Sequence, residues 1–305
     1  MSGIRLDGRV AIVTGAGRSL GRAYALALAA AGADVVVNDI DAASASEVVT
    51  AVAEAGGRAV ASIGPVGPTA TAEQLVHDAV AAFGRVDVLV ANAGVLRDRT
   101  LLKMTDDDFD LVVETHLRGA FTTGRAAAAR MREQGDGGRI VLIGSPAGQF
   151  GSFGQTSYAA AKAGIVAMAR TWSLELAKAG ITANAVIPTA LSPMTATIPA
   201  YAEPYERFLA GEPIPHELRH DRALGAAEDV APLIVWLAST ASAGVTGQAI
   251  GIGGDRLTLY SHPAVLDADH ADGGWTAAGI DAAWASRFAP QAQHSGPPSR
   301  GGAEA

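Results

Sequence analysis

Cysteine is absent from this 305-residue chain, and aromatic residues make up only 5% of it. Without cysteine there can be no disulfide, no thiol catalysis and no Cys-ligated metal. Long apolar runs are missing too, since none reaches the roughly 18–20 residues of a membrane span. The N-terminus also lacks the basic and then apolar pattern of a signal peptide. The sequence therefore predicts a cytoplasmic location and no membrane partner.

Basic residues are in the minority. The chain carries 23 Lys and Arg against 31 Asp and Glu, a formal net charge of −8. Nucleic acids and anionic membranes attract clustered cations, so neither is expected as a partner. Apolar residues are abundant at 49% of the total, which is enough for one large α/β domain with a sizeable core or for two small ones.

Short apolar segments alternate with longer helical ones over most of the chain. Such alternation is typical of parallel strands joined by helices, so the sequence predicts an α/β protein with a doubly wound sheet. The expected strands are 9–13, 35–39, 58–62, 86–90, 140–143, 181–187 and 248–252. The expected helices are one after the first glycine turn to about 31, then about 43–55, 71–83, 106–132, one around Tyr158 to about 179, and 228–239.

A glycine-rich turn, Thr14–Gly21, joins the first predicted strand to the first helix. Gly15 would let the chain turn sharply, Gly17 would leave space for a ligand, and Gly21 would let the helix pack closely on the strand. The free N–H groups at the start of that helix would then face a pyrophosphate. This context indicates a dinucleotide site.

Asp39 ends the second predicted strand. A carboxylate there can accept hydrogen bonds from the adenosine ribose and would repel a 2′-phosphate, which favours NAD over NADP. Arg18 weakly favours the opposite preference, because a guanidinium beside the phosphate loop could bind that phosphate. We expect the carboxylate in direct contact to discriminate more strongly. Asn92, at the end of the fourth strand, could hold the cofactor or simply cap the turn.

Tyr158 and Lys162 stand four residues apart in a run of helix-forming residues, so their side chains share one helix face. A tyrosine hydroxyl titrates near 10, and a neighbouring ammonium lowers that pKa by favouring the phenolate. Ser145 follows a buried strand and would lie at the sheet edge where α/β proteins bind ligands. An exposed Tyr–Lys pair without function is common, so the pair gains weight only from the surrounding motifs.

Two segments fall outside the alternating pattern. Residues 189–224 contain several prolines and scattered large apolar groups, which is typical of a lid over a lipophilic substrate. We place the catalytic domain at 1–260 and a C-terminal extension at 261–288, in which an apolar stripe on a helix over 275–288 would dock on a protein surface. The Gly- and Pro-rich tail, 289–305, is predicted to be disordered.

Taken together, these motifs resemble the classical short-chain dehydrogenase/reductase family over roughly residues 5–255. The segments that carry the resemblance are Thr14–Gly17 with Gly21, Asp39, Asn92-Ala93-Gly94, Ser145, Tyr158 with Lys162, and the stretch after Pro188. The family implies a Rossmann-type sheet of seven parallel strands in the order 3-2-1-4-5-6-7, with helices on both faces. It also implies a homotetramer or homodimer.

The resemblance assigns roles to individual residues. Tyr158 would be the general acid/base, Lys162 would lower its pKa and hold the nicotinamide ribose, and Ser145 would bind the substrate oxygen. Ser192 would contact the carboxamide, and Asn92 would line the adenosine side. The full set of implied cofactor-binding residues is Gly15, Gly17, Arg18, Ser19, Leu20, Gly21, Asp39, Asn92, Ala93, Gly94, Tyr158, Lys162, Pro188 and Ser192.

Four positions depart from the family pattern. Ser19 replaces the second glycine of the fingerprint, and Pro65 replaces an Asp that often binds adenine. His116 occupies the position of the fourth catalytic residue, usually Asn, so its catalytic role is in doubt. Thr189 replaces the glycine of a Pro-Gly pair and should stiffen the start of the lid.

Several strings, including His116–Phe121, are similar to the (3R)-hydroxyacyl-CoA dehydrogenase unit of peroxisomal multifunctional enzyme type 2. That similarity implies an NAD(H)-dependent oxidoreductase that interconverts a secondary alcohol and a ketone. The expected substrate is lipophilic or CoA-linked, such as a 3-hydroxyacyl-CoA or a hydroxysteroid.

Two alternatives remain. The chain could be a family member that binds the cofactor without turnover. His216-Glu217-Leu218-Arg219-His220 also spells the H-E-x-x-H pattern of zinc peptidases. No third-ligand motif follows it, and prolines precede it, so we expect a solvated helix and no metal site there.

Overall fold

The computed structural model describes residues 3–293 and 295–296. The chain divides into two compact units, Met1–Tyr260 and Ser261–Ala305. Within the described residues, no helix is both long and apolar enough to cross a membrane.

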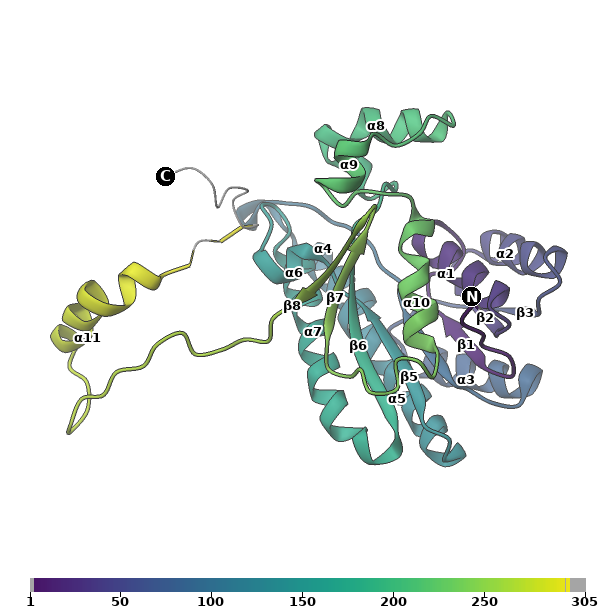
Figure 1. Cartoon of the computed structure of the whole chain (residues 1–305), viewed down its shortest axis with the longest axis horizontal. Coiled ribbons are helices and arrows are strands. Elements are labelled where there is room, and N and C mark those ends of the chain that lie inside the picture. Colours follow the sequence, from purple (N-terminus) through teal and green to yellow (C-terminus); the bar gives the residue numbers. More distant parts are fainter. Residues whose placement is uncertain (1–2, 294, 297–305) are drawn as a thin grey trace. The chain divides into compact units, whose positions relative to one another are not determined.

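The first unit is built on one eight-stranded sheet in the order β3-β2-β1-β4-β5-β6-β7-β8 (Figure 1). The strands are β1 Val10–Val13, β2 Asp34–Asp39, β3 Ala59–Ile63, β4 Val88–Ala91, β5 Gly138–Ile143, β6 Ile181–Pro188, β7 Ala249–Gly253 and β8 Arg256–Tyr260. Strands β1 to β7 are parallel, which confirms the predicted fold and strand order.

The eighth strand was not predicted. It pairs antiparallel with β7, and Gly253 lies opposite Arg256, so only Gly254 and Asp255 form the turn. Gly254 adopts a positive φ of 50°, which a two-residue hairpin turn requires and which glycine adopts without steric cost. The glycine pair followed by alternating apolar residues is therefore a hairpin signal at this edge of the sheet.

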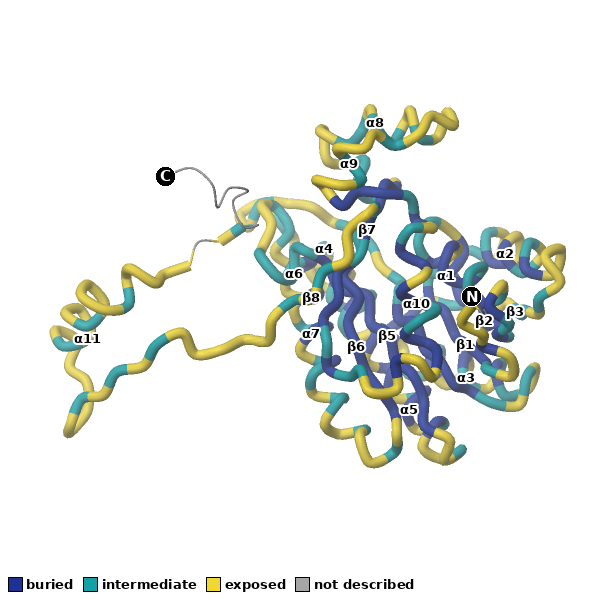
Figure 2. The backbone as a smooth tube through the Cα atoms, in the orientation of Figure 1, coloured by how far each residue is buried: buried dark blue, intermediate teal, exposed yellow. Residues whose placement is uncertain are grey.

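Helices cover both faces of the sheet. The main helices are α1 Ser19–Ala30, α2 Ala42–Glu54, α3 Thr69–Phe83, α4 Asp106–Val113, α5 Gly119–Gln134, α6 Pro146–Phe150, α7 Thr156–Glu175, α8 Pro199–Leu209, α9 His216–His220, α10 Ala231–Ala238 and α11 Ala277–Ala283. Residues of α1, α2 and α10 join one apolar core, and residues of α3, α5 and α7 join a second. Strands β1, β4 and β5 are buried along their whole length (Figure 2), as expected for parallel strands covered on both faces.

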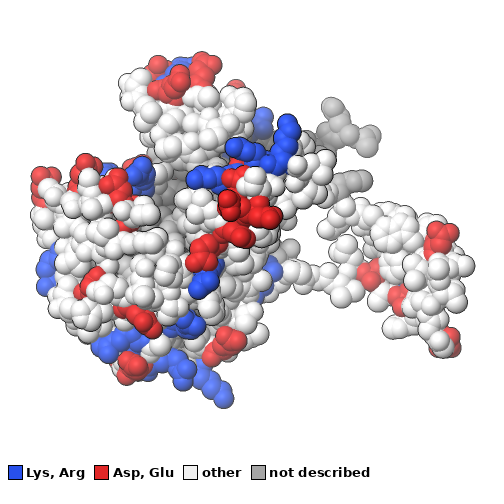
Figure 3. Space-filling view, turned by 180° about the vertical axis from the view of Figure 1, so that it is seen from behind, with Lys and Arg blue, Asp and Glu red and all other residues white. Residues whose placement is uncertain are grey.

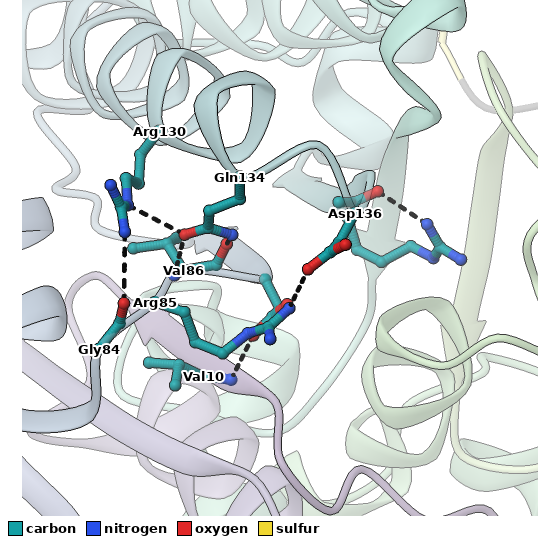
Figure 4. A network of polar contacts seen from close by, with 10 residues as sticks. Val10, Gly84, Arg85, Val86, Arg130, Gln134 and Asp136 are labelled. Atoms are coloured by element: carbon teal, nitrogen blue, oxygen red, sulfur yellow. Dashed lines mark hydrogen bonds and ion pairs between the residues drawn. The ribbon is translucent and has the colours of Figure 1, made fainter.

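A polar network fastens the edge of the sheet where β1 and β4 begin (Figure 4). Asp87 accepts a 2.9 Å hydrogen bond from the backbone N–H of Val10 and is held by Arg85. Gln134, at the end of α5, bonds both the N–H and the carbonyl of Val86. The buried polar groups at the starts of these strands thus have hydrogen-bond partners within the protein.

The predicted helix over 106–132 is confirmed, but it contains a π-helical turn at Glu114–Arg118 between α4 and α5. Such turns insert one extra residue into the helical repeat and are frequent at functional sites. His116 lies within this turn and is buried.

The segment predicted as a lid, 189–224, contains α8 and α9. No residue of α8 is buried, whereas the far end of the segment is tied to the body of the unit. Arg219 of α9 forms ion pairs with Asp229 at 2.8 Å and with Asp255 at 2.9 Å. The N–H of Leu191 also bonds the carbonyl of Gly225 at 2.7 Å. The segment is therefore anchored at both ends and loosely packed between them.

The second unit contains α11 and a π turn, Trp284–Phe288, that continues it. The Thr276 hydroxyl caps α11, and Arg287 pairs with Asp267 at 2.6 Å. Residues 289–305 were predicted to be disordered. Residue 294 and residues 297–305 of this segment lie outside the described residues. Of the remainder, Ala289–Gln291 forms a short 3-10 turn.

Basic and acidic side chains are intermingled over the face of the molecule drawn in Figure 3.

Candidate active site

The structure brings the predicted site residues to one edge of the sheet. Every segment that carries them follows the C-terminal end of a parallel strand or packs beside one. These segments are the turn after β1, Asp39 in β2, residues 92–94 after β4, Ser145 after β5, the first turns of α7, and Pro188 with Ser192 at the end of β6. This is the edge at which open α/β sheets bind ligands.

The turn after β1 has no room for a side chain at its three glycine positions. Gly15 has a positive φ of 61°, and a Cβ there would lie 2.7 Å from the Cα of Ala93. A Cβ on Gly21 would collide with the carbonyl oxygen of Gly15, and one on Gly17 would lie 2.8 Å from the Asp39 carboxylate. The positive φ of Gly15 fits the sharp turn predicted there, and the contacts at Gly21 fit the predicted close packing of helix on strand. A side chain at Gly17 would meet Asp39 and Ser44, and the space for a ligand predicted at Gly17 stays a prediction.

The N-terminus of α1 is open to an anion. No side chain caps it, and its first turn contains no acidic residue. Unpaired N–H groups and the helix dipole make such an end attractive to phosphate. Ser19, at the position of the missing fingerprint glycine, has a φ of 50°, a left-handed conformation that costs a non-glycine residue roughly 1–2 kcal/mol. Ser19 therefore keeps the left-handed backbone conformation of the turn although it is not glycine.

Asp39 is buried and oriented by two backbone groups. Its Oδ2 accepts a hydrogen bond from Gly17 N at 2.9 Å, and its Oδ1 accepts one from Asp41 N at 3.1 Å. The carboxylate is thus fixed beside the glycine-rich turn Thr14–Gly21, which is called the phosphate turn below after its predicted role. A fixed carboxylate, an uncapped helix and a turn with glycine at its three tightest positions together fit the adenosine and pyrophosphate portions of a nicotinamide dinucleotide.

Asn92 fastens the two central strands to each other. Its side-chain amide donates 3.0 Å bonds to the carbonyls of Thr14 and Gly15, and its N–H donates to the Thr14 hydroxyl. Ala93 N also donates to that hydroxyl, at 3.1 Å. Of the two roles left open for Asn92, the structure shows the one that shapes the turn. Contact with a cofactor stays a prediction.

Ser145 caps the short helix α6. Its hydroxyl oxygen accepts a 3.2 Å bond from Ala147 N, which leaves the hydroxyl proton free for another partner. The Ser145 side chain lies near enough to the Tyr158 hydroxyl to lower the pKa of the phenol, which is the direction that favours the phenolate. The serine and tyrosine predicted to share a substrate oxygen therefore lie together.

Tyr158 is buried, and burial is the main influence on its acidity. Loss of hydration raises the pKa of the phenol above its ordinary value, and the nearby Ser145 hydroxyl only partly opposes this shift. The sequence predicted that Lys162 would lower the pKa of Tyr158. In the structure, the pKa of Tyr158 is raised instead. The phenol is therefore protonated at neutral pH.

Lys162 is fully buried beneath Tyr158. Its Nζ donates a 2.6 Å hydrogen bond to the carbonyl oxygen of Ile143 and lies 5.6 Å from the centre of the tyrosine ring. Burial lowers the pKa of this amine from 10.5 to about 7. The protein alone thus holds a neutral phenol above an amine that titrates near physiological pH, which explains why the ammonium does not dominate the acidity of Tyr158.

His116 packs its ring edge-on against Tyr158, with 5.1 Å between ring centres. Its Nε2 lies 3.0 Å from the N atom and 2.8 Å from the O atom of Val95, so the tautomer decides which bond forms. Its Nδ1 is buried and has no hydrogen-bond partner in the described part of the chain. Burial and the nearby Lys162 hold the pKa of His116 well below its usual value. The ring is neutral.

The start of the predicted lid segment, 189–224, lies beside Tyr158. The Sδ atom of Met194 lies 3.9 Å from the Tyr158 hydroxyl. Ser192 is buried and shares hydrogen bonds with Thr195, including one from Ser192 N to the Thr195 hydroxyl at 2.8 Å. Its contact with a carboxamide stays a prediction.

Three groups in this region were not singled out from the sequence. They are the Thr14 hydroxyl, the Ile143 carbonyl and Asp41. Thr14 could have been found, because a small polar residue between a buried strand and a glycine turn is a common hydrogen-bonding position. The other two depend on distant segments meeting, which local patterns do not reveal.

The H-E-x-x-H run forms α9, one short exposed helix. The rings of His216 and His220 stack 5.2 Å apart, and His220 bonds Asp221. Across residues 3–293 and 295–296, no three His, Cys, Asp or Glu side chains gather in a way that could hold a metal ion.

Residues 9–201 match the model of the short chain dehydrogenase family. Hydroxyacyl-CoA dehydrogenase ChsB1 of Mycobacterium tuberculosis is 42% identical over 280 residues, which are 88% of this chain and 84% of that protein. Peroxisomal multifunctional enzyme type 2 of Mus musculus is 42% identical over 245 residues, 77% of this chain but only 30% of that longer protein. The chain therefore belongs to the short-chain dehydrogenase family of oxidoreductases, whose members normally bind a nicotinamide cofactor.

Solved structures agree with this placement. A short chain dehydrogenase from Mycobacterium avium is 35% identical and superimposes with a TM-score of 0.81, over 97% of this chain and 98% of the other.

Proposed function

We propose that the chain is an NAD(H)-dependent oxidoreductase that interconverts a secondary alcohol and a ketone on a CoA-linked or lipophilic substrate, with a 3-hydroxyacyl-CoA as the favoured class. The observation that carries the proposal is the meeting of Ser145, Tyr158 and Lys162 at the edge of the sheet that also holds the glycine turn and Asp39. The names of the relatives support the substrate class.

The chemistry assigned to each residue follows from its surroundings. The protonated phenol of Tyr158 would donate a proton to the substrate oxygen during ketone reduction and take one back during alcohol oxidation. Ser145 would donate a hydrogen bond to the same oxygen as its charge develops. A bound nicotinamide dinucleotide supplies the hydride donor or acceptor.

Lys162 would act from below the phenol. Its amine lies close to the tyrosine ring and titrates near 7, so a proton gained or lost there changes the field at Tyr158 within the working pH range. His116, wedged against the ring, would keep the phenol in place as a neutral positioning residue. We further propose that residues 189–224 cover the substrate, because Met194 already contacts the tyrosine hydroxyl.

The preference for NAD rests on Asp39. Its buried carboxylate faces the phosphate turn, and a 2′-phosphate placed beside it would meet like charge at low dielectric. A cytoplasmic homotetramer or homodimer completes the proposal.

The test is alcohol oxidation followed by NADH absorbance, with NAD and NADP in parallel, over a panel of 3-hydroxyacyl-CoA and hydroxysteroid substrates. Tyr158→Phe should lower turnover by about 100-fold or more. Tyr24→Phe, which removes a buried hydroxyl from α1 outside the site, is the matched control and should retain turnover. Wild-type activity in Tyr158→Phe would show that the acid/base is misassigned. Tight NADH binding without turnover of any substrate would favour a cofactor-binding homologue.

A further inference from the structure

One carboxylate near the phosphate turn collects an unusual set of hydrogen-bond donors. Asp41 caps the N-terminus of α2, where its Oδ1 accepts from Ala43 N at 3.0 Å. Its Oδ2 accepts from the Ser44 hydroxyl at 2.8 Å and from Arg18 Nη2 at 2.9 Å. A guanidinium, a hydroxyl and a helix N-terminal N–H are the donors that bind a phosphate group in proteins. Here they all converge on a side chain of the protein itself.

This cluster adjoins the position proposed for the adenosine ribose. Asp41 N donates to Asp39 Oδ1 at 3.1 Å, and Asp39 Oδ2 accepts from Gly17 N. A Cβ on Gly17 would lie 2.8 Å from both the Asp39 carboxylate and the Cβ of Ser44. The phosphate turn, the end of β2 and the start of α2 are therefore packed into one cluster.

Asp41 is charged in this setting. Hydrogen bonds from Ser44 and Ala43, together with the positive charge of Arg18, hold the pKa of its carboxyl below the usual range. The Arg18 side chain stays largely accessible, with 66% of its surface exposed. It is the one cation of the phosphate turn, and its charge is matched by Asp41.

We propose that Asp41 is a specificity-determining residue that rejects NADP(H) by occupying, with its own carboxylate, the donors that a 2′-phosphate would need. The inference rests on the proposed function, because it assumes a dinucleotide at this edge. It differs from the role of Asp39, which excludes the phosphate by repulsion at the ribose. Asp41 instead withholds Arg18, Ser44 and the first N–H groups of α2.

Asp39 and Asp41 would hinder a 2′-phosphate in two different ways, so the effects of substituting them should not simply add. Removing the Asp39 charge alone leaves Arg18 paired, and removing the Asp41 charge alone leaves the repulsion at the ribose. Only the double substitution should both release Arg18 and remove the repulsion at the ribose. Asparagine is the substitution of choice at 41, because it still caps α2 while it no longer holds the guanidinium by charge.

The test measures binding rather than turnover. Adenosine 2′,5′-bisphosphate and 5′-AMP are titrated by calorimetry at fixed ionic strength into the full-length wild type and the Asp39→Ser, Asp41→Asn and double variants. The measured quantity is the ratio of the two affinities, so 5′-AMP is the internal reference in each variant. A charge-assisted bond to phosphate changes affinity by about 10-fold to 100-fold, and the double variant should gain that factor beyond Asp39→Ser alone.

Two further variants sharpen the result. Adding Arg18→Ala to the double variant should remove most of the gain, and Asp107→Asn, which deletes an exposed carboxylate of α4, should leave the ratio at its wild-type value. If the affinity ratio of the double variant is no higher than that of Asp39→Ser, or if the gain survives Arg18→Ala, this inference is wrong. The proposed NAD(H) function would still stand. Failure of the wild type to bind either 5′-AMP or NADH would overturn both this inference and the proposed NAD(H) function.

Discussion

Replacing Lys162 by methionine should stabilise the fold while it destroys activity. Burial lowers the pKa of this amine from 10.5 to about 7. At about 1.4 kcal/mol per pKa unit, keeping the charged form buried costs the folded chain at most about 5 kcal/mol. Methionine has a similar length and no charge to bury. It loses the hydrogen bond to Ile143, worth about 1 kcal/mol, so we expect a net gain of about 2–4 kcal/mol at pH 6.

The gain should depend on pH with a definite sign. Below pH 7 the lysine is protonated in both the folded and the unfolded chain, so the wild type bears the full cost of burial. Between pH 7 and 10.5 the unfolded chain binds the proton and the folded chain does not, so wild-type stability rises with pH. The advantage of Lys162→Met should therefore shrink steadily from pH 7 upward.

Urea unfolding at pH 6, 7, 8 and 9, at one protein concentration and ionic strength, measures this difference directly. The matched control is Lys178→Met, because Lys178 is exposed and its replacement should change stability little at any of these pH values. A Lys162→Met protein less stable than wild type at pH 6, or a difference that does not vary with pH, would refute the reasoning.

Three other substitutions test separate parts of the structure. Ser19→Gly should raise the free energy of unfolding by up to about 1 kcal/mol, because glycine adopts the φ of 50° without strain; a lower melting temperature would contradict this. Tyr24→Phe should be stabilising by about 1 kcal/mol in the same assay, since the buried Tyr24 hydroxyl has no hydrogen-bond partner among the described residues, and destabilisation would mean that the hydroxyl is bonded after all. His116→Phe should cost about 1–3 kcal/mol by leaving Val95 unpaired. That cost should narrow below pH 6.5, where only the unfolded wild-type histidine takes up a proton, and a constant difference would argue against the neutral ring.

Much of the fold could be predicted because its signal is local. Apolar segments buried on both faces, such as β4 and β5, read as continuous Val- and Ile-rich runs, and glycine turns mark where they end. Strand β8 was not predicted, although its residues Leu257 and Leu259 alternate with polar ones after the glycine pair, because five residues are too few to separate a strand from a loop by alternation alone. The π turn around His116 was not predicted either, because one extra residue in a long helix leaves the apolar pattern almost unchanged.

The sequence indicated which residues would gather at the predicted site, but it did not indicate their electrostatics. The spacing of Tyr158 and Lys162 places both on one helix face, yet it says nothing of how deeply either is buried. Burial reverses the expected direction of the tyrosine pKa and brings the lysine pKa to about 7. In the same way, Arg18 was weighed as a free cation, whereas the fold pairs it with Asp41 from another segment.

The most direct test of the central claim follows the hydrogen that is transferred. A 3-hydroxyacyl-CoA with deuterium on the carbon that bears the hydroxyl is incubated with NAD and the wild-type chain. The account predicts that deuterium appears on the nicotinamide ring of NADH in equal amount to the ketone formed, and that Tyr158→Phe slows this transfer by about 100-fold or more. Ketone formed without deuterated NADH, or transfer at the wild-type rate in Tyr158→Phe, would contradict it.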